Sequence, residues 1–199
     1  MAIDIQSLTV KQLDEALQVW EATLGGDFKL DRQEVADRLQ HGAGIFYVAV
    51  DGETGRMVGI KFGFIDGEVC IGRGIAVLPA YRRQGIATRL ILQFEQELHA
   101  RPAIKVYAFG SDSTEGIPFH IAAGYFPQAL IQLTDRELRA ALDLSGFVIN
   151  HEGFNEQYQV YQIFTALDSS QANFDTLRSL QAQYPQVSIQ YFFKKTIKR

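Results

Sequence analysis

The chain has 199 residues, of which 47% are hydrophobic and 21% are charged, so its composition excludes a disordered chain. This length suits one domain, or one compact domain with an extension. The formal net charge of −4 argues against a nucleic-acid-binding protein, because such proteins usually carry a basic excess.

The cysteine and histidine content bears on the cellular compartment and on metal binding. Cys70 is the single cysteine, so a disulfide within the chain is impossible and a reducing cytoplasm is the expected location. The four histidines are isolated from one another, and no spacing suggests a zinc site. The first residues lack the pattern of a signal peptide, and no apolar stretch is long enough to cross a bilayer. We therefore expect a cytoplasmic protein with no metal and no membrane partner.

The N-terminal part predicts a strand, two helices and three further strands. A short apolar run at residues 3–8 predicts the first strand, and apolar residues at helical spacing from Leu13 to Leu24 predict the first helix. Asp31 and Glu34 are spaced as a capping box at the start of the second helix. Three strand-like segments separated by Asp-Gly turns follow, at residues 45–50, 57–65 and 69–78. Short strands divided by such turns predict antiparallel hairpins.

The remainder of the chain alternates between helix and strand patterns. Ile86, Leu90, Phe94 and Leu98 repeat every four residues and predict a helix at residues 85–100. The later elements are expected as a strand at 104–109, a short helix at 117–123, a strand at 125–133, a helix capped by Thr134 and Glu137, a strand at 157–167, a helix at 174–184 and a strand at 187–193. The whole order predicts an α/β fold with a mixed, mostly antiparallel central sheet flanked by helices, followed by an α-β-α-β extension.

The turn between the strand at 69–78 and the following helix carries the clearest chemical signal. Arg82, Arg83 and Gln84 occupy this turn, and Gly85 opens the helix. The first turn of a helix leaves its N–H groups unpaired and carries partial positive charge, and glycine lets an anion approach the backbone closely. Neighbouring arginines add charge-assisted hydrogen bonds. These features predict a pyrophosphate site, whereas the alternative is an ordinary connection with a solvated basic turn.

The same segment resembles the cofactor-binding motif of the GNAT superfamily of N-acetyltransferases, Gln/Arg-x-x-Gly-x-Gly/Ala. Arg82, Gly85 and Ala87 stand at its defined positions, and the preceding Ile-Ala-Val-x-Pro-x-Tyr-Arg is also typical of the superfamily. The resemblance covers residues 3–130. It implies an acyl-CoA-binding domain at residues 1–135, with residues 136–199 packed on it as an acceptor pocket or a dimer surface.

The resemblance also implies how acyl-CoA binds. Residues of the motif loop would hold the pyrophosphate through their backbone N–H groups and side chains, namely Arg82, Arg83, Gln84, Gly85, Ile86, Ala87 and Thr88. Ala76 and Val77 would bind the pantetheine arm through their backbone. A wedge between this strand and the strand at 104–109 would hold the thioester, and an N–H group near Val77 would stabilise the oxyanion.

The implied reaction is direct attack of a primary amine on the thioester, which requires an acid for the leaving thiolate and a base for the amine. The superfamily often uses a tyrosine as the acid, but His120 stands at that position in Phe119-His-Ile-Ala-Ala-Gly124-Tyr125. Histidine can donate a proton near neutral pH, so His120 is the predicted acid. The alternative is a structural histidine in a site that relies on water. Glu68 is the first candidate for the base, and Asp112 and Glu115 are others.

Two functions are consistent with this pattern. The first is an acetyl-CoA-dependent N-acetyltransferase acting on a small-molecule or peptide amine, with a possible homodimer implied by the resemblance. The second is a non-catalytic CoA-binding or interaction module, which the missing tyrosine favours. Cys70 lies in an apolar strand, so we expect a small buried hydrophobic residue there and no nucleophile.

Overall fold

The structure, a computed structural model, describes residues 2–25, 29–111, 116–168 and 171–197. It divides into two compact units, of which the first comprises Met1–Phe109 and Thr196–Arg199 and the second Gly110–Lys195. These structural units have other bounds than the functional domains predicted at residues 1–135 and 136–199, which remain a prediction.

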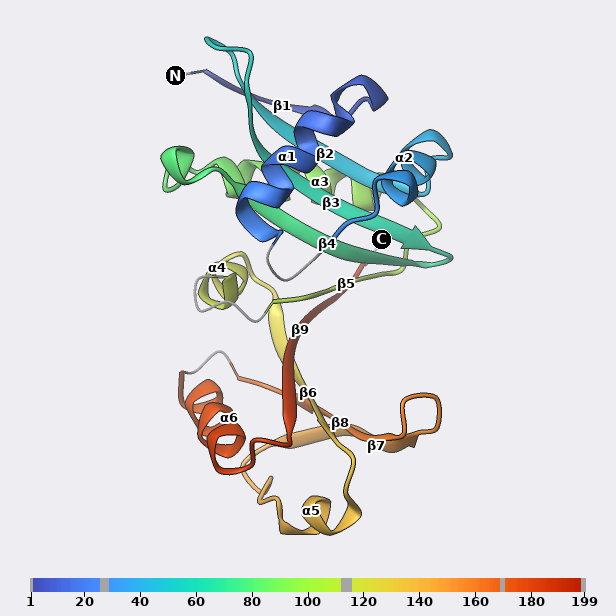
Figure 1. Cartoon of the computed structure of the whole chain (residues 1–199), viewed down its shortest axis with the longest axis vertical. Helices are drawn as coiled ribbons and strands as arrows, with labels where there is room; N and C mark the ends of the chain where they lie inside the picture. The colour runs from blue at the N-terminus through green and yellow to red at the C-terminus, as the bar shows by residue number, and fades with distance from the viewer. Residues whose placement is uncertain (1, 26–28, 112–115, 169–170, 198–199) are drawn as a thin grey trace. The chain divides into compact units, whose positions relative to one another are not determined.

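The first unit is built on a sheet in the order β1-β2-β3-β4-β5 (Figure 1). Neighbouring strands from β1 to β4 are antiparallel, and β5 is parallel to β4. Its elements are β1 (Ile3–Ser7), η1 (Val10–Gln12), α1 (Leu13–Leu24), α2 (Arg32–Gln40), β2 (Gly44–Asp51), β3 (Met57–Asp66), β4 (Val69–Val77), η2 (Pro79–Tyr81), α3 (Ile86–Ala100) and β5 (Val106–Gly110). The predicted mixed, mostly antiparallel sheet is therefore confirmed.

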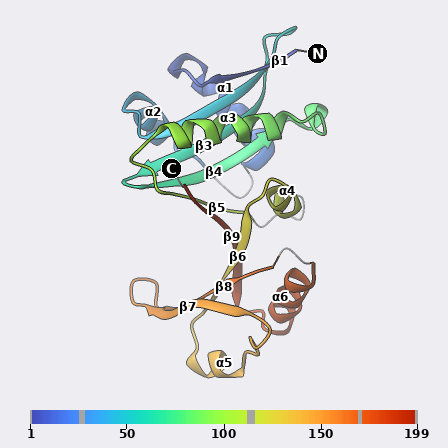
Figure 2. The ribbon, with the colours of Figure 1, turned by 180° about the vertical axis from the view of Figure 1, so that it is seen from behind.

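Helices cover both faces of this sheet, which explains the continuous apolar runs of β2 and β3. Figure 1 shows α1 in front of the sheet, and Figure 2, from behind, shows α3 across the opposite face. Trp20 of α1 stacks on Phe62 of β3, with ring centroids 5.9 Å apart. Phe94 of α3 packs against Tyr107 of β5, with centroids 5.3 Å apart. These contacts form the two hydrophobic layers that hold β3 and β4 in place.

The start of α2 confirms the predicted N-cap. The Asp31 carboxylate accepts a hydrogen bond from the Glu34 N–H at 2.8 Å. This bond satisfies one of the donors that the first turn of a helix leaves unpaired. Val35 then packs in the same core as α1, so α2 lies on the α1 side of the sheet.

The second unit has its own antiparallel strand array in the order β9-β6-β8-β7. Its elements are α4 (Gly116–Ala122), β6 (Phe126–Leu133), α5 (Arg136–Ala141), β7 (Val148–Asn155), β8 (Val160–Ala166), α6 (Gln171–Gln183) and β9 (Ser188–Thr196). Helix α6 packs on this sheet through Phe174, whose ring lies 5.3 Å from that of Tyr191 on β9. Each helix and strand expected beyond residue 110 is present.

Two features of the second unit differ from the sequence prediction. The strand β7 was not predicted, because its residues are mostly exposed and show no alternation of apolar and polar side chains. The cap of α5 is also one residue later than expected. The Asp135 carboxylate, and not Thr134, accepts a hydrogen bond from the Glu137 N–H, at 2.7 Å.

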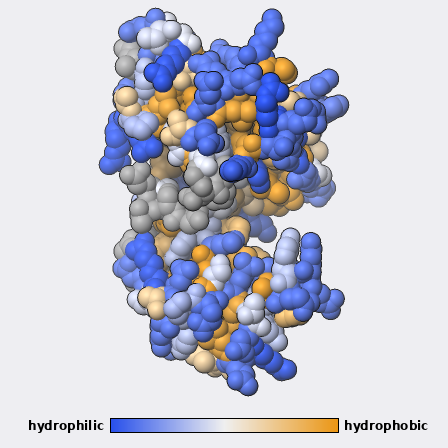
Figure 3. Space-filling view, viewed as in Figure 1, coloured by the Kyte–Doolittle hydropathy of each residue, from blue (hydrophilic) through white to orange (hydrophobic). Residues whose placement is uncertain are grey.

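The surface is mostly hydrophilic on each unit in the view of Figure 3, with apolar residues showing in patches. Large exposed apolar side chains include Val10, Leu92, Phe126, Val148 and Tyr158. Among the described helices, none combines the length and the apolar character needed to cross a bilayer.

Candidate cofactor-binding site

The loop between β4 and α3 is anchored to the end of β2. The Tyr81 hydroxyl donates a hydrogen bond to Asp51 Oδ2 at 3.0 Å, and Asp51 Oδ1 accepts the Glu53 N–H at 3.0 Å. The hydrogen bond from the Glu53 backbone, together with that from Tyr81, holds the pKa of Asp51 below its ordinary value. The hydrogen bond between Tyr81 and Asp51 also raises the pKa of Tyr81. A charged, nearly buried carboxylate therefore fixes the tyrosine that precedes the basic turn.

The basic turn itself adopts an unusual backbone path. Arg83 has a φ of 63° and Gly85 a φ of 74°, so both lie in the left-handed region. Glycine adopts this region without cost, whereas a non-glycine residue is uncommon there. Two such residues so close together turn the chain sharply from η2 into α3.

The first turn of α3 begins at an open N-terminus. Gly85 is the N-cap and provides no side chain to accept from the backbone N–H groups of Ile86, Ala87 and Thr88. A Cβ added at Gly85 would meet no atom of the described residues within 4 Å. The backbone here is therefore accessible, and the helix dipole gives it partial positive charge. These are the physical requirements of an anion site.

Basic side chains surround this N-terminus. Arg82, Arg83 and Arg89 are all exposed. Arg82 donates from Nε to the Val77 carbonyl at 3.1 Å, which folds its side chain back toward the edge of β4. Arg89 donates from Nη2 to the Ile3 carbonyl at 2.7 Å. The chain as a whole is acidic, so this group of arginines is a local concentration of positive charge.

The second half of β4 has an open edge. On the β5 side, pairing covers only the stretch from Val69 to Gly72, where Gly72 lies opposite Phe109. Residues 73–77 continue the strand, and within the described parts of the chain they pair only with β3. A register shift at Phe62 and Gly63 of β3 places Arg73 in a bulge at this point. We call the divergence of β4 from β5 beyond Gly72 the fork.

The pairing with β3 determines which groups face the fork. The Leu78 N–H donates to the Val58 carbonyl at 2.9 Å, and the register pairs Ala76 with Ile60. Backbone groups of alternate residues point to opposite edges of a strand, so Ala76 also points toward β3. The N–H groups of Ile75 and Val77 therefore point toward the fork. This corrects the expectation for Ala76, because Ile75 is the residue that can bind a ligand there.

The predicted acid, His120, lies in the second unit, whereas Val77 and the fork lie in the first. His120 belongs to α4 and has 7% of its side-chain surface exposed. Its ring lies 5.1 Å from the centroid of Phe193 and 6.1 Å from that of Tyr125. The imidazole thus sits in an aromatic cluster, and its role as an acid remains a prediction.

Glu68 is the first candidate for the base. Glu68 precedes β4 and forms an ion pair with Lys105, and both side chains are mostly exposed. Val77 lies nine residues further along an extended strand, which corresponds to about 30 Å. The fork begins beyond Gly72, four residues after Glu68, so the role of Glu68 as the base remains a prediction. The other candidates, Asp112 and Glu115, lie outside the described residues.

Cys70 is confirmed as a buried residue with no sign of activation. Its side chain is fully buried, and burial raises the pKa of its thiol to about 11. A thiol with so high a pKa is protonated at neutral pH and is a poor nucleophile.

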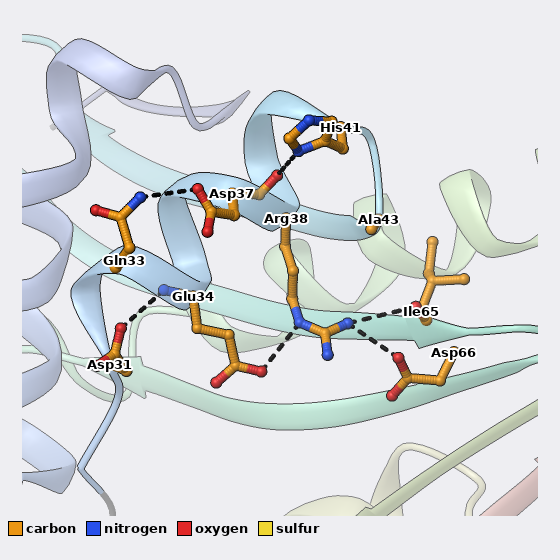
Figure 4. A pocket seen from close by; sticks show the side chains of 9 residues that line it. All are labelled: Asp31, Gln33, Glu34, Asp37, Arg38, His41, Ala43, Ile65 and Asp66. Carbon is orange, nitrogen blue, oxygen red and sulfur yellow. Dashed lines mark hydrogen bonds and ion pairs between the residues drawn. The ribbon is translucent and has the colours of Figure 1, made fainter.

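A shallow cavity of about 680 Å³ lies beside α2 (Figure 4). Carboxylates of Asp31, Glu34, Asp37 and Asp66 line it. Arg38 spans the cavity and pairs with both Glu34 and Asp66 at 3.1 Å. The described residues contain no group of three side chains suited to hold a metal ion. Because Asp66 lies at the hairpin end of β3, this cavity is separate from the fork.

Two residues that shape this site, Ile75 and Asp51, could not be predicted from the sequence. Ile75 was overlooked because only the strand register shows which backbone groups face outward. Asp51 was assigned to a turn, although its contact with Tyr81 spans 30 residues of sequence. Neither the backbone direction at Ile75 nor the contact between Asp51 and Tyr81 leaves a local pattern in the sequence.

Comparison with known proteins identifies the fold. Residues 42–125 match the family described as the acetyltransferase (GNAT) domain. The chain is similar to a GNAT-family acetyltransferase from Staphylococcus aureus Mu50, with 15% identity, coverage of 99% of this chain and 100% of that chain, and a TM-score of 0.53. It is also similar to the ribosomal-protein-S18-alanine N-acetyltransferase from Escherichia coli, with 16% identity, coverage of 85% and 95%, and a TM-score of 0.52.

A third similar structure is the paia N-acetyltransferase from Thermoplasma acidophilum in complex with coenzyme A. Identity is 13%, coverage is 84% of this chain and 100% of that chain, and the TM-score is 0.50. No curated protein matches the sequence. The family match confirms the resemblance stated from the motif at Arg82 to Ala87, and these structures show the fold.

Proposed function

Since residues 42–125 match the acetyltransferase (GNAT) domain family, we propose that the chain transfers an acetyl or other short acyl group from acyl-CoA to a primary amine. One observation carries the proposal. An open, glycine-capped helix N-terminus lies next to the unpaired edge of β4, and both belong to the same compact unit. The first feature suits a pyrophosphate and the second suits an extended pantetheine arm.

The cofactor would be bound first through its pyrophosphate. The N–H groups of Ile86, Ala87 and Thr88 would donate to the phosphate oxygens, and Arg83 and Gln84 lie beside them in the turn. Arg82 would exchange its hydrogen bond to the Val77 carbonyl for a charge-assisted bond to phosphate. The complex of the similar Thermoplasma acidophilum enzyme with coenzyme A supports this choice of ligand.

The pantetheine arm would then extend along the open edge of β4 as an added strand. Its amide groups would pair with the outward backbone groups of Ile75 and Val77. The thioester would reach the fork, where β5 leaves β4 after Phe109. One of these N–H groups would polarise the thioester carbonyl and stabilise the oxyanion.

The chemical step is a direct transfer with no covalent enzyme intermediate. The amine nitrogen forms a bond to the acyl carbon, the bond from that carbon to sulfur breaks, and the thiolate leaves. The attacking nitrogen gives its proton to a base or to water, and Glu68 is the first candidate for that base. His120 is the proposed donor of a proton to the thiolate. The products are an amide and CoA.

The acceptor is a primary amine of a small molecule or a peptide. The similar Escherichia coli enzyme is named as an alanine N-acetyltransferase of ribosomal protein S18, which supports an amine acceptor in this fold. Residues 136–199 are proposed to contribute an acceptor wall or a homodimer surface. The cytoplasmic location also stays a prediction.

A thiol-release assay tests the proposal. Acetyl-CoA is incubated with the protein and with a panel of primary amines, and the CoA thiol is measured with a chromogenic disulfide. Release that depends on both protein and amine is the expected result. Binding of CoA without release across a broad panel would favour a non-catalytic CoA-binding module. Absence of CoA binding would contradict both functions.

A further inference from the structure

Lys61 is a buried cation in the centre of the first unit. It lies in the apolar strand β3, between Ile60 and Phe62, and only 3% of its surface is exposed. Lysine is almost never fully buried unless its ammonium has partners, because removing a charge from water is costly. The proposed chemistry does not use this residue, so its burial needs another explanation.

The Lys61 ammonium lies among three aromatic rings and two carbonyl groups. It is 4.5 Å from the ring centroid of Phe94, 5.4 Å from that of Tyr107 and 5.8 Å from that of Phe109. It also donates to the carbonyls of Phe62 and Gly74, each at 3.4 Å. Carbonyl dipoles and aromatic faces both stabilise a cation, so these contacts offset part of the cost of burying the ammonium.

These partners lie on both sides of the fork. Gly74 belongs to β4 and directly precedes Ile75, whereas Tyr107 and Phe109 belong to β5. Phe109 is opposite Gly72, in the last residue pair before the two strands separate. The side chain of Lys61 therefore starts on β3, passes over β4 and contacts the rings of β5 at the place where the fork begins.

The β4 backbone and the β5 side chains are tightly packed at Gly72. A Cβ added at Gly72 would lie 2.7 Å from the Tyr107 hydroxyl oxygen and 2.8 Å from Phe109 Cβ. The β5 rings thus rest directly on the β4 backbone. The ammonium above them links a β4 carbonyl to these rings through electrostatic attraction, which is lost if the charge is lost.

We propose that the Lys61 ammonium is a positioning group that holds the fork between β4 and β5 in the geometry that binds the acyl-CoA arm. The inference rests on the proposed function of the open β4 edge. Lys61 acts through Gly74 and the β5 rings, which set the position of the Ile75 N–H and the width of the fork. It does not itself react with the thioester.

The charge of Lys61 changes within an accessible pH range. Burial lowers the pKa of Lys61 to about 8. The titratable groups that face it are the Cys70 thiol from β4 and the Tyr107 hydroxyl from β5, and α3 contributes the Phe94 ring. Cys70 stays neutral across this range because burial raises its pKa to about 11. The affinity for CoA should therefore fall as the pH rises through 8.

The test is the dissociation constant for CoA, measured by titration calorimetry below and above pH 8. Wild-type affinity should fall about fivefold across this range, as expected for the loss of cation–π and carbonyl contacts. Lys61→Met keeps the apolar stem but removes the charge. Below pH 8 this variant should bind CoA about fivefold more weakly than wild type, and its affinity should not fall further above pH 8. Lys105→Met removes an exposed lysine of the same unit and should behave as wild type.

A merely structural role would give a different pattern. Replacing a buried charge with an apolar side chain often stabilises a protein, so Lys61→Met should unfold at higher denaturant concentration while binding CoA more weakly. Weaker binding together with lower stability would overturn the inference, as would wild-type affinity or an unchanged pH dependence in Lys61→Met. If wild-type protein binds no CoA at any pH, the proposed function fails and this inference fails with it.

Discussion

Single residues determine whether an anion can reach the start of α3. Gly85 was predicted from its place before a helical pattern, and its positive φ explains why glycine is suited there. The positive φ of Arg83 was not predicted, because no local preference of arginine indicates it. Lys61 was passed over as one polar residue in an apolar strand. A lone lysine inside such a run is the signal that could have identified it.

Lys61 also predicts how stability depends on pH. Its pKa is about 8 in the folded state against an ordinary 10.5, so the unfolded chain binds more protons between these values. The free energy of unfolding should therefore rise with pH through this window. Lys61→Met should raise that free energy by about 3 kcal/mol below pH 8 and by little above pH 10.5.

Urea denaturation of both proteins across the pH range measures this difference. Cys70 acts with the opposite sign, because its pKa is raised from 9.0 to about 11 and the folded state keeps the proton longer. Since Cys70 is present in both proteins, the difference between them isolates Lys61. A stability difference that does not change with pH would contradict the titration of Lys61.

His120→Phe tests the proposed acid. Phenylalanine suits the aromatic cluster of Phe119, Tyr125 and Phe193, so the fold should persist. If His120 protonates the thiolate, kcat should fall by about a hundredfold or more while the dissociation constant for CoA stays unchanged. Steady-state kinetics with an accepted amine gives both values. Turnover equal to that of wild type would show that His120 is a structural residue.

Elements with regular apolar patterns were predicted well, and those defined by distant pairing were not. The helix α3 follows from its four-residue repeat, and β2, β3 and β4 follow from Asp-Gly turns. The strand β7 has mostly exposed residues and exists through its pairing with β8. The fork likewise depends on where β5 stops pairing with β4, which is a non-local property.

Two proline substitutions test the orientation of the β4 backbone. The Ala76 N–H points into the ladder with β3, so Ala76→Pro should lose about 3 kcal/mol of stability. The Val77 N–H points toward the fork, and Val77→Pro should cost much less stability. If that N–H stabilises the oxyanion, kcat should fall by about a hundredfold. Equal destabilisation by both variants would contradict the assigned alternation.

At the scale of the whole molecule, the residues with proposed roles belong to different units. The pyrophosphate loop, the open β4 edge and Lys61 belong to the first unit, whereas His120 belongs to the second. The motif and the family match concern residues 42–125, so they predict the cofactor far better than the acceptor. The acceptor site is proposed to involve residues 136–199, whose sequence matches no motif considered above.

Ligand binding should stabilise the protein if CoA binds only the folded state. At a CoA concentration about a hundred times the dissociation constant, the free energy of unfolding should rise by about 2.7 kcal/mol. Differential scanning fluorimetry with and without CoA detects such a change as a higher melting temperature. A melting temperature that does not respond to CoA at any concentration would contradict binding to the folded chain.

The central claim is that the backbone at Gly85 binds the CoA pyrophosphate, and calorimetric titration of two matched variants with CoA tests it most directly. Gly85 has a φ of 74° and Gly67 a φ of 59°, and an added Cβ at either meets no described atom within 4 Å. Gly85→Ala and Gly67→Ala should therefore lose similar stability, about 1 kcal/mol. Only Gly85→Ala should lose CoA affinity, by about tenfold or more, because its methyl group blocks the phosphate. Equal CoA affinity in the two variants would contradict the account.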